Sequence, residues 1–204
     1  MEQSQSMRSD IYLLLATLFR HEPSEELLGF LTHLEFEHNG TPMAEAWSAL
    51  ISSSQHNSAS AIADEYQELF IGIGRGEVVP FSSWHITGSL MEKPLAEIRF
   101  DLSKIGLERS ENVKEPEDHI AALCEIMSYL CDADQQQQKA FFNRHISPWY
   151  TSLVEQIHSA PSANFYLAAA KLLSAFLNLE NVAFSDAKSS KRNTHKIEVK
   201  NLSN

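Results

Sequence analysis

Helical periodicity runs through almost all of this 204-residue chain, and it excludes most other fold classes. Apolar residues recur at the three- and four-residue spacing that gives a helix one buried face. The pattern covers residues 11–19, 59–70, 95–105, 120–131 and 162–179. The best candidate strand, Val78-Val79, is short and is followed at once by Pro80, which a strand interior does not accept. The sequence therefore predicts an all-α fold, a single bundle of roughly nine or ten helices.

Local signals place several helix boundaries. Ser24 offers an N-cap oxygen to a helix that contains residues 27–31. Thr41-Pro42 predicts another helix start, because proline suits the first helical position. Residues 52–60 are rich in serine and predict a polar linker between two helices.

The chain carries no feature of a membrane or secreted protein. No apolar run approaches the roughly 20 residues that cross a bilayer. The first residues lack the basic region, apolar core and cleavage site of a secretory signal, so we expect a cytoplasmic protein. Cys124 and Cys131 lie about 10 Å apart along one helix face. That distance is too long for a disulfide, and two cysteines do not make a zinc site, so we expect buried free thiols and no metal.

Charge is distributed unevenly along the chain. The formal net charge is −11, yet the segment after residue 184 carries five basic residues and two acidic ones. An acidic body argues against nucleic acid or an anionic membrane as partner, and it suits a basic ligand or peptide. We predict one domain over residues 1–184 and a disordered basic tail over 185–204, because the tail has almost no apolar content.

A glycine-rich segment, residues 72–92, interrupts the helical pattern. It opens with Gly72, Gly74 and Gly76, in a G-x-G-x-G spacing. This spacing lacks the register of a dinucleotide site and the Gly-Lys-Ser/Thr ending of a phosphate loop. A helix end followed by a turn fits better, because glycine adopts positive φ without strain. The segment then divides the helices into two groups, residues 7–71 and 93–184.

Polar and aromatic residues follow these glycines. Ser82 and Ser83 with His85 could be an activated nucleophile, but a triad needs a third group and an oxyanion hole, and no nucleophile elbow surrounds them. We expect the two serine hydroxyls to cap a helix or to hydrogen-bond within a turn. Trp84 is either a core side chain or a partly exposed peptide anchor. We favour the anchor, because Phe81, next to Pro80 and nearer the apolar Leu69-Phe70 pair, is the better core side chain.

The segment "EPEDH", residues 115–119, predicts the start of a helix with Pro116 in its first turn. Glu117 and Asp118 would place negative charge at the positive end of that helix dipole, which is a purely structural role. His119 should stay neutral there, because a cation is disfavoured at a helix N-terminus. A role of His119 as a general base is a weaker alternative. Metal binding by His85 and His119 is a further weak alternative.

Two segments together resemble a known family. "EYQELFIGIGRGEVVPFSSWH", residues 65–85, is followed about 30 residues later by "EPEDHIAALCEIMSYL". This combination resembles the TorD/DmsD family of cytoplasmic chaperones, which are redox-enzyme maturation proteins for molybdoenzymes. The matching positions are Tyr66, Leu69, Phe70, Gly72, Gly74, Pro80, Ser82 or Ser83, Glu115, Pro116, Asp118 and His119. The resemblance covers most of residues 7–180 and leaves the basic tail outside.

The resemblance implies a chaperone and not an enzyme. Its partners would be the twin-arginine signal peptide and the apo catalytic subunit of a molybdoenzyme, held until the cofactor is inserted. The glycine-rich segment would join the two helix groups as a hinge and line the client groove with the Asp-His pair. The implied client-binding residues are Tyr66, Phe70, Gly72, Gly74, Pro80, Ser82, Ser83, Trp84, His85, Glu115, Asp118 and His119.

Three further expectations accompany this assignment. The chain needs no cofactor, although the family resemblance implies weak binding of guanine nucleotides. The alternative function is a nucleotide-binding or hydrolytic enzyme that uses the glycine-rich loop and the Asp-His pair. A glycine hinge also permits domain swapping, so the chain is expected to be a monomer or a swapped dimer.

Overall fold

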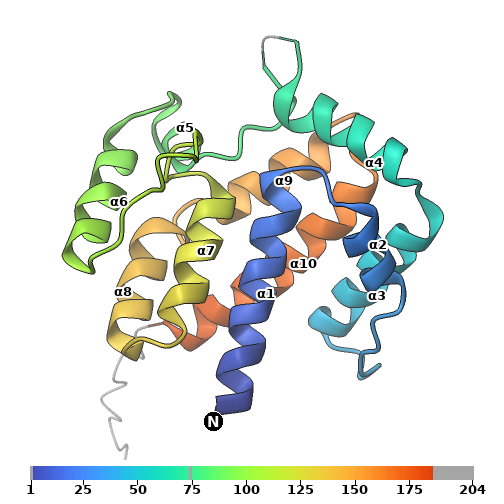
Figure 1. The fold of residues 1–204 in the computed structure, drawn as a ribbon, viewed down its shortest axis with the longest axis horizontal. Coiled ribbons are helices and arrows are strands. Elements are labelled where there is room, and N and C mark those ends of the chain that lie inside the picture. Colours follow the sequence, from blue (N-terminus) through green and yellow to red (C-terminus); the bar gives the residue numbers. More distant parts are fainter. Residues whose placement is uncertain (1, 74, 186–204) are drawn as a thin grey trace, which may run out of the picture.

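The computed structural model describes residues 2–73 and 75–185 of the chain. Within them it contains ten α-helices and one π-helical turn, arranged as in Figure 1. The elements are α1 (Glu2–Arg20), α2 (Glu25–Thr32), α3 (Pro42–His56), α4 (Ala59–Tyr66), η1 (Gln67–Ile71), α5 (Ser82–Thr87), α6 (Lys93–Lys104), α7 (Ile120–Leu130), α8 (Gln135–His145), α9 (Tyr150–Ser159) and α10 (Phe165–Ala183). The predicted all-α fold class is confirmed. The predicted disordered tail, apart from Ser185, lies outside the described residues.

Side-chain caps explain where several helices begin. Ser24 Oγ accepts a hydrogen bond of 3.2 Å from the Leu27 N–H, and Thr41 caps α3 in the same way. The predicted cap at Ser24 and the predicted helix start at Thr41-Pro42 are therefore confirmed. The predicted linker over residues 52–60 is wrong, because α3 continues to His56 and Ser58 already caps α4. Serine is tolerated in the last turns of α3, where Ser54 Oγ hydrogen-bonds to the Leu50 carbonyl four residues earlier.

The helices share one apolar core that includes residues from both sides of the glycine-rich segment. Helix α1 packs along α7, and α10 packs against α3 and α9 behind them (Figure 1). A buried carboxylate ties this arrangement together, because Glu180 of α10 accepts hydrogen bonds from Tyr12 at 2.9 Å and from Arg8 at 2.6 and 3.0 Å. The first and last described helices are thus joined inside the molecule.

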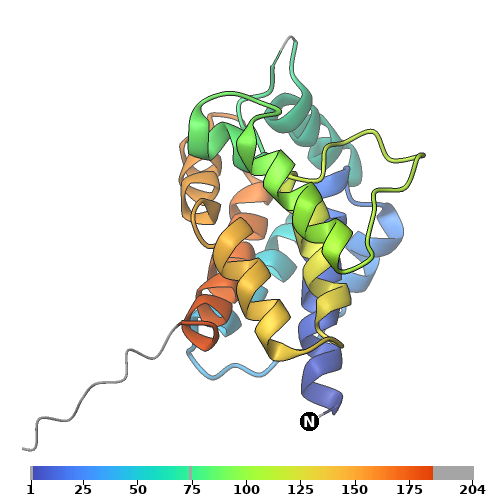
Figure 2. The same cartoon turned by 90° about the vertical axis from the view of Figure 1, so that its left-hand side faces the viewer.

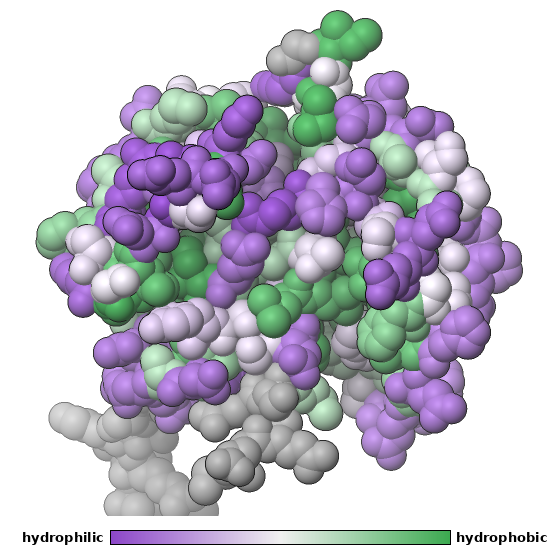
Figure 3. Space-filling model, in the orientation of Figure 1, coloured by the Kyte–Doolittle hydropathy of each residue, from purple (hydrophilic) through white to green (hydrophobic). Residues whose placement is uncertain are grey.

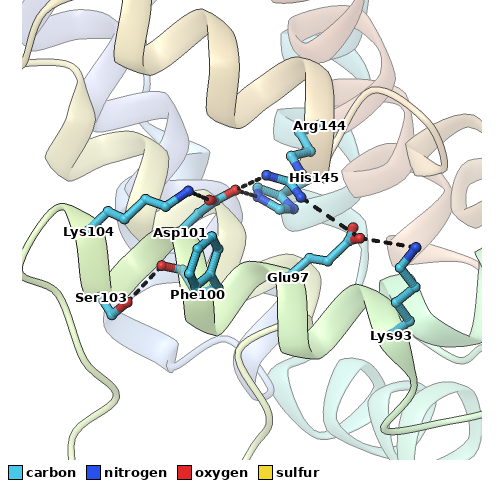
Figure 4. Close-up of polar contacts among 8 residues, drawn as sticks. All are labelled: Lys93, Glu97, Phe100, Asp101, Ser103, Lys104, Arg144 and His145. Atoms are coloured by element: carbon cyan, nitrogen blue, oxygen red, sulfur yellow. Dashed lines mark hydrogen bonds and ion pairs between the residues drawn. The ribbon is translucent and has the colours of Figure 1, made fainter.

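A second polar group fixes α6 against α8 (Figure 4). The carboxylate of Asp101 contacts Lys104 at 2.9 Å, Arg144 at 2.8 Å and His145 at 2.9 Å. Arg144 also lies 3.8 Å from Glu97. These contacts hold the helix that directly follows the glycine-rich segment.

Two predicted boundaries near the motifs are wrong. The glycine-rich segment contains a short helix, α5, where no helix was expected. The helix predicted to start at Pro116 instead starts at Ile120 with His119 as its N-cap, so Glu117 and Asp118 precede it. In Figure 2 the connection from α6 to α7, which contains these residues, projects from one side of the molecule.

The predicted state of both cysteines is confirmed, since Cys124 and Cys131 are buried and free. Burial raises the pKa of the Cys131 thiol to about 11 and raises that of Cys124 further. Across the described part of the chain, no helix combines the length and apolarity that crossing a membrane requires.

Candidate functional site

Residues 79–85, which follow the glycine loop, are held along one face of α9. The Val79 N–H donates to Gln156 Oε1 at 3.0 Å, and His85 Nδ1 lies 2.9 Å from Ser152 Oγ. Ser152 and Gln156 are four residues apart, so they point to the same side of α9. The His85 ring stacks on Trp149 with centroids 5.2 Å apart, and burial lowers the pKa of His85. His85 therefore acts as a neutral hydrogen-bonding side chain.

The segment that contains residues 115–119 contacts the segment after the glycine loop through its backbone. Residues 80–82 and 118–120 form a short antiparallel bridge centred on Phe81 and His119. Two backbone hydrogen bonds of 2.9 Å close it, from the Ser82 N–H to the Asp118 carbonyl and from the Ile120 N–H to the Pro80 carbonyl. The two segments that carry the sequence resemblance thus meet directly in the structure.

Asp118 acts on α5 and not, as was predicted, on the helix that follows it in the sequence. Its Oδ2 accepts a hydrogen bond of 3.0 Å from the Ser83 N–H, at the start of α5, and its side chain is buried. A carboxylate at this position satisfies a free N–H group and places negative charge at the positive end of the helix dipole. Asp118 therefore caps α5, and the prediction that it lies in the first turn of the following helix is wrong.

His119 caps α7 as a neutral imidazole. Its Nδ1 accepts a hydrogen bond of 3.0 Å from the Ala121 N–H, and its ring meets the Phe81 ring edge-on at 4.9 Å. Burial, together with the nearby charge of Arg20, lowers the pKa of His119 to about 3. The predicted neutral state is confirmed, and the nitrogen that a base would use is occupied by the cap.

The hydroxyls of Ser82 and Ser83 are buried, and neither has a hydrogen-bond partner among the described residues. The prediction that these hydroxyls cap a helix is wrong, because the backbone N–H groups of the two serines make the contacts instead. A nucleophilic serine needs a base within hydrogen-bond reach. No such base contacts either hydroxyl in the described part of the chain.

The glycine loop is a tight reversal of the backbone. Gly72 has φ of 59°, which favours glycine, and its N–H donates to the Gln67 carbonyl at 2.7 Å. Gly76 lies so close to the Leu69 carbonyl that a Cβ would collide with it. The prediction of a helix end followed by a turn is confirmed at these two glycines. Gly74 lies outside the described residues.

Trp84 connects α5 to this loop. The Arg75 guanidinium lies over the Trp84 ring at 4.7 Å from the ring centroid. Arg75 is exposed and Trp84 is half-buried, so part of the Trp84 side chain is accessible at the surface. A stacked cation of this kind keeps an aromatic ring oriented.

Tyr66 and Phe70 belong to the core. Their rings lie 5.1 Å apart, and each also packs on Tyr166 of α10. Burial, with the charges of Glu22 and Glu115, raises the pKa of Tyr66 to about 12. Glu115, which is exposed, therefore lies near this aromatic group.

Carboxylates surround Arg20 beside the same group. Arg20 Nη2 lies 2.6 Å from Glu125 Oε2, while Glu22 and Glu115 are near enough for their charges to affect Tyr66. Glu22, Glu115 and Glu125 are all exposed. With Lys114 directly before Glu115 in the sequence, three carboxylates here accompany two basic side chains.

Sequence reasoning missed Glu65 and Glu77. Glu65 is buried and accepts hydrogen bonds from the first backbone N–H groups around the start of α10, at Asn164 (2.8 Å), Phe165 (2.9 Å) and Tyr166 (2.8 Å). Glu77 accepts from the Ser162 N–H at 3.1 Å and hydroxyl at 2.8 Å. Carboxylates satisfy helix N-termini well, but here the partners are about 100 residues away along the sequence, so no local signal reveals them.

Exposed apolar side chains recur along the segment that these contacts hold in place. Between residues 71 and 91 they are Ile71 (53 % exposed), Ile73 (107 %), Ile86 (47 %), Leu90 (51 %) and Met91 (74 %). Figure 3 shows apolar atoms on the loop that projects at the top of the molecule. We call residues 71–91 with Glu115 the 71–91 face.

The predicted site residues therefore divide into two sets. Tyr66, Pro80, Ser82, Ser83, Asp118 and His119 are buried and hold the 71–91 face in place. Phe70, Gly72, Trp84 and His85 are half-buried, and Glu115 is exposed. Only the second set can touch a partner without rearrangement of the fold.

The chain is similar to known proteins in sequence and in fold. The family model described as "Nitrate reductase delta subunit" matches residues 18–155. The chaperone protein TorD of Vibrio parahaemolyticus is 26% identical over 199 residues, covering 85% of this chain and 93% of that protein. TorD of Vibrio cholerae is 27% identical over 196 residues, with 83% and 88% covered. A solved structure described as a redox enzyme maturation protein from Archaeoglobus fulgidus has the same fold, with a TM-score of 0.58, 22% identity, and 86% and 94% of the chains covered.

Proposed function

Because this chain belongs to the nitrate reductase delta subunit family, we propose that it is a cytoplasmic chaperone for the maturation of a molybdoenzyme. The family resemblance predicted from the two motifs is confirmed, and the curated relatives are named chaperones, in agreement with the expectation that the chain is not an enzyme. On this proposal the chain binds a twin-arginine signal peptide and the apo catalytic subunit, and releases them after cofactor insertion.

The 71–91 face is the observation that carries this proposal. Its exposed apolar side chains belong to one segment that buried polar contacts hold in a defined shape. Soluble domains seldom keep such clusters exposed unless a partner covers them. Trp84 lies within the segment and is only half-buried, and tryptophan is a frequent anchor in peptide binding.

Charge supports a basic peptide as the occupant. A twin-arginine leader places two guanidinium groups beside an apolar stretch, and guanidinium pairs well with carboxylates in two-point hydrogen bonding. Glu115 and Glu22 provide exposed carboxylates beside the aromatic group of Tyr66. We propose that these acids receive the arginines while the 71–91 face receives the apolar stretch.

Calorimetric titration of the full chain with a synthetic twin-arginine leader tests this function. We expect a Kd of ~1 μM or tighter, about −8 kcal/mol. A leader with both arginines replaced by glutamine should bind at least about tenfold more weakly, and added salt should weaken only the native leader. Equal affinity for both leaders, with equal salt dependence, would contradict the proposed recognition of the arginines.

Substitution of Glu115 in this chain provides the reciprocal test. Glu115→Gln should weaken binding of the native leader severalfold and leave the affinity of the glutamine leader unchanged. Glu111→Gln removes an equal charge from the same connection and is the matched control. Binding of guanine nucleotides, implied by the family resemblance, stays a prediction that the same calorimeter can check with GTP.

A further inference from the structure

A concave surface lies at the opposite end of the molecule from the 71–91 face. It is a groove of about 1340 Å³ between the N-terminal half of α1, the end of α2, the connection from α2 to α3, the first half of α3, and the C-terminal end of α10. Its floor is mainly apolar and includes Ile11, Leu14, Phe30, Trp47, Phe176 and Leu179. We call it the α1/α10 groove. It shares no lining residue with the 71–91 face.

Apolar surface in this groove is well exposed. Phe30 is 59 % exposed and Leu179 is 56 % exposed, although both line a concavity and not a convex surface. Exposed apolar patches within a groove mark surfaces where a segment or partner binds.

The rim of the α1/α10 groove is acidic. Asp10, Glu35 and Glu37 line it, and the structure gives them no ion pair among the described residues. Arg8 is also present, but its guanidinium is engaged by Glu180 at 2.6 Å. The charge available to an occupant is therefore negative, and a basic segment would match it.

One segment of this chain has the matching chemistry and begins at the groove. Ala183 and Phe184, at the end of the described chain, line the groove, so residues 186–204 continue directly from its edge. That segment contains the basic residues Lys188, Lys191, Arg192, Lys196 and Lys200, against Asp186 and Glu198. Its larger apolar residues, Ile197, Val199 and Leu202, follow the basic pair.

The length of the segment is sufficient. Residues 186–204 span up to ~60 Å when extended, at about 3.3 Å per residue. The Lys191-Arg192 pair can therefore reach the acidic rim, and the residues beyond it can return over the apolar floor. An intramolecular occupant also has a high effective concentration, so weak contacts suffice.

We infer that residues 186–204 bind in the α1/α10 groove of the same chain. The basic residues face Asp10, Glu35 and Glu37, and the apolar residues at the end of the segment cover Phe30 and Leu179. The segment is then an internal ligand that any external partner of this groove must displace. This inference does not depend on leader binding at the 71–91 face.

A spin label on the C-terminal segment tests the inference in the full chain. Ser203→Cys introduces a reactive thiol, while Cys124 and Cys131 are buried with raised pKa values and stay unlabelled. We expect the label to cause loss of amide NMR signals from residues 7–14, 34–47 and 176–184, with little loss on α5, α6 or α9. Uniform loss, or none, would overturn the inference.

Matched substitutions show whether the groove itself is responsible. Leu179→Lys places a positive charge on the floor and should restore the lost signals. Leu13→Lys makes the same change at a similarly exposed site of α1 (47 %) that does not line the groove, and should leave the losses unchanged. Lys191→Gln with Arg192→Gln should reduce the losses as Leu179→Lys does.

Mixing separates the two sources of the occupant. Spin-labelled chain without isotope is mixed with isotope-labelled chain without spin label, at the concentration of the first measurement. Signals lost in the mixture would assign the groove to a second copy of the chain and overturn the intramolecular assignment. Retention of all signals in the mixture supports it.

Discussion

At the scale of single residues, the side chains that mark the family mostly act on other parts of this protein. Asp118 caps α5, and His119 caps α7. Both are buried, which removes them from direct contact with a client. Their chemical identity still matters, because each satisfies a backbone N–H group that would otherwise lack a partner.

His119 makes the stability of the fold depend on pH. Its pKa is about 3 in the folded protein, mainly because of burial, and near 6.5 in the unfolded chain. The unfolded state therefore binds more protons between these values, so stability falls as the pH drops below 6.5. By pH 5 this effect should cost about 2 kcal/mol.

His119→Asn should remove most of this dependence, because asparagine can also cap a helix and does not titrate. Urea denaturation at pH 7.5 and pH 5 measures the difference. The exposed His158, changed to Asn, is the control and should keep the dependence of the native chain. A His119→Asn protein that loses as much stability as the native chain would show that other groups cause the effect.

Substitution of Trp84 can distinguish a role in partner contact from a role in core packing. It is half-buried under Arg75, so Trp84→Ala should cost little stability but weaken leader binding at least about tenfold. Tyr129→Ala removes another exposed aromatic side chain, from α7, and should change neither quantity. Calorimetry and urea denaturation on both variants give the result. A large loss of stability with normal affinity would place Trp84 in the core.

At the scale of elements, the sequence predicts helix starts that neighbouring residues cap and misses a helix start that a distant residue caps. The starts of α2 and α3 follow from Ser24 and Thr41, each of which caps the helix directly after it. The short helix α5 was missed because its capping side chain, Asp118, lies 35 positions away in the sequence. The motif spacing predicted that the two segments belong together, but only the structure shows that residues 80–82 and 118–120 pair.

Local sequence patterns also missed the role of Glu65. This residue lies on α4, and its side chain supports the start of α10. Glu65→Gln leaves one oxygen for three N–H donors and turns an NH₂ group toward them, so we expect a loss of about 1–3 kcal/mol. Glu68→Gln changes an exposed carboxylate one turn later and should cost almost nothing. Urea denaturation midpoints compare the two variants. Equal midpoints would show that the buried carboxylate contributes no net stability.

At the scale of the whole molecule, one apolar core supports two surfaces at opposite ends. The 71–91 face is held by α9 and by residues 118–120, whereas the α1/α10 groove lies where the described chain ends. Helical periodicity was enough to predict the all-α fold, because each helix buries one stripe in that core. It did not predict the groove, which several helices and a connection form together.

Hydrogen–deuterium exchange of the full chain, with and without the twin-arginine leader, tests the central claim most directly. We predict that the leader slows exchange at residues 71–91 and around Glu115, and leaves residues 34–47 and 176–184 unchanged. Protection confined to the α1/α10 groove, or no protection at a leader concentration well above the Kd, would contradict the claim that the 71–91 face binds the client.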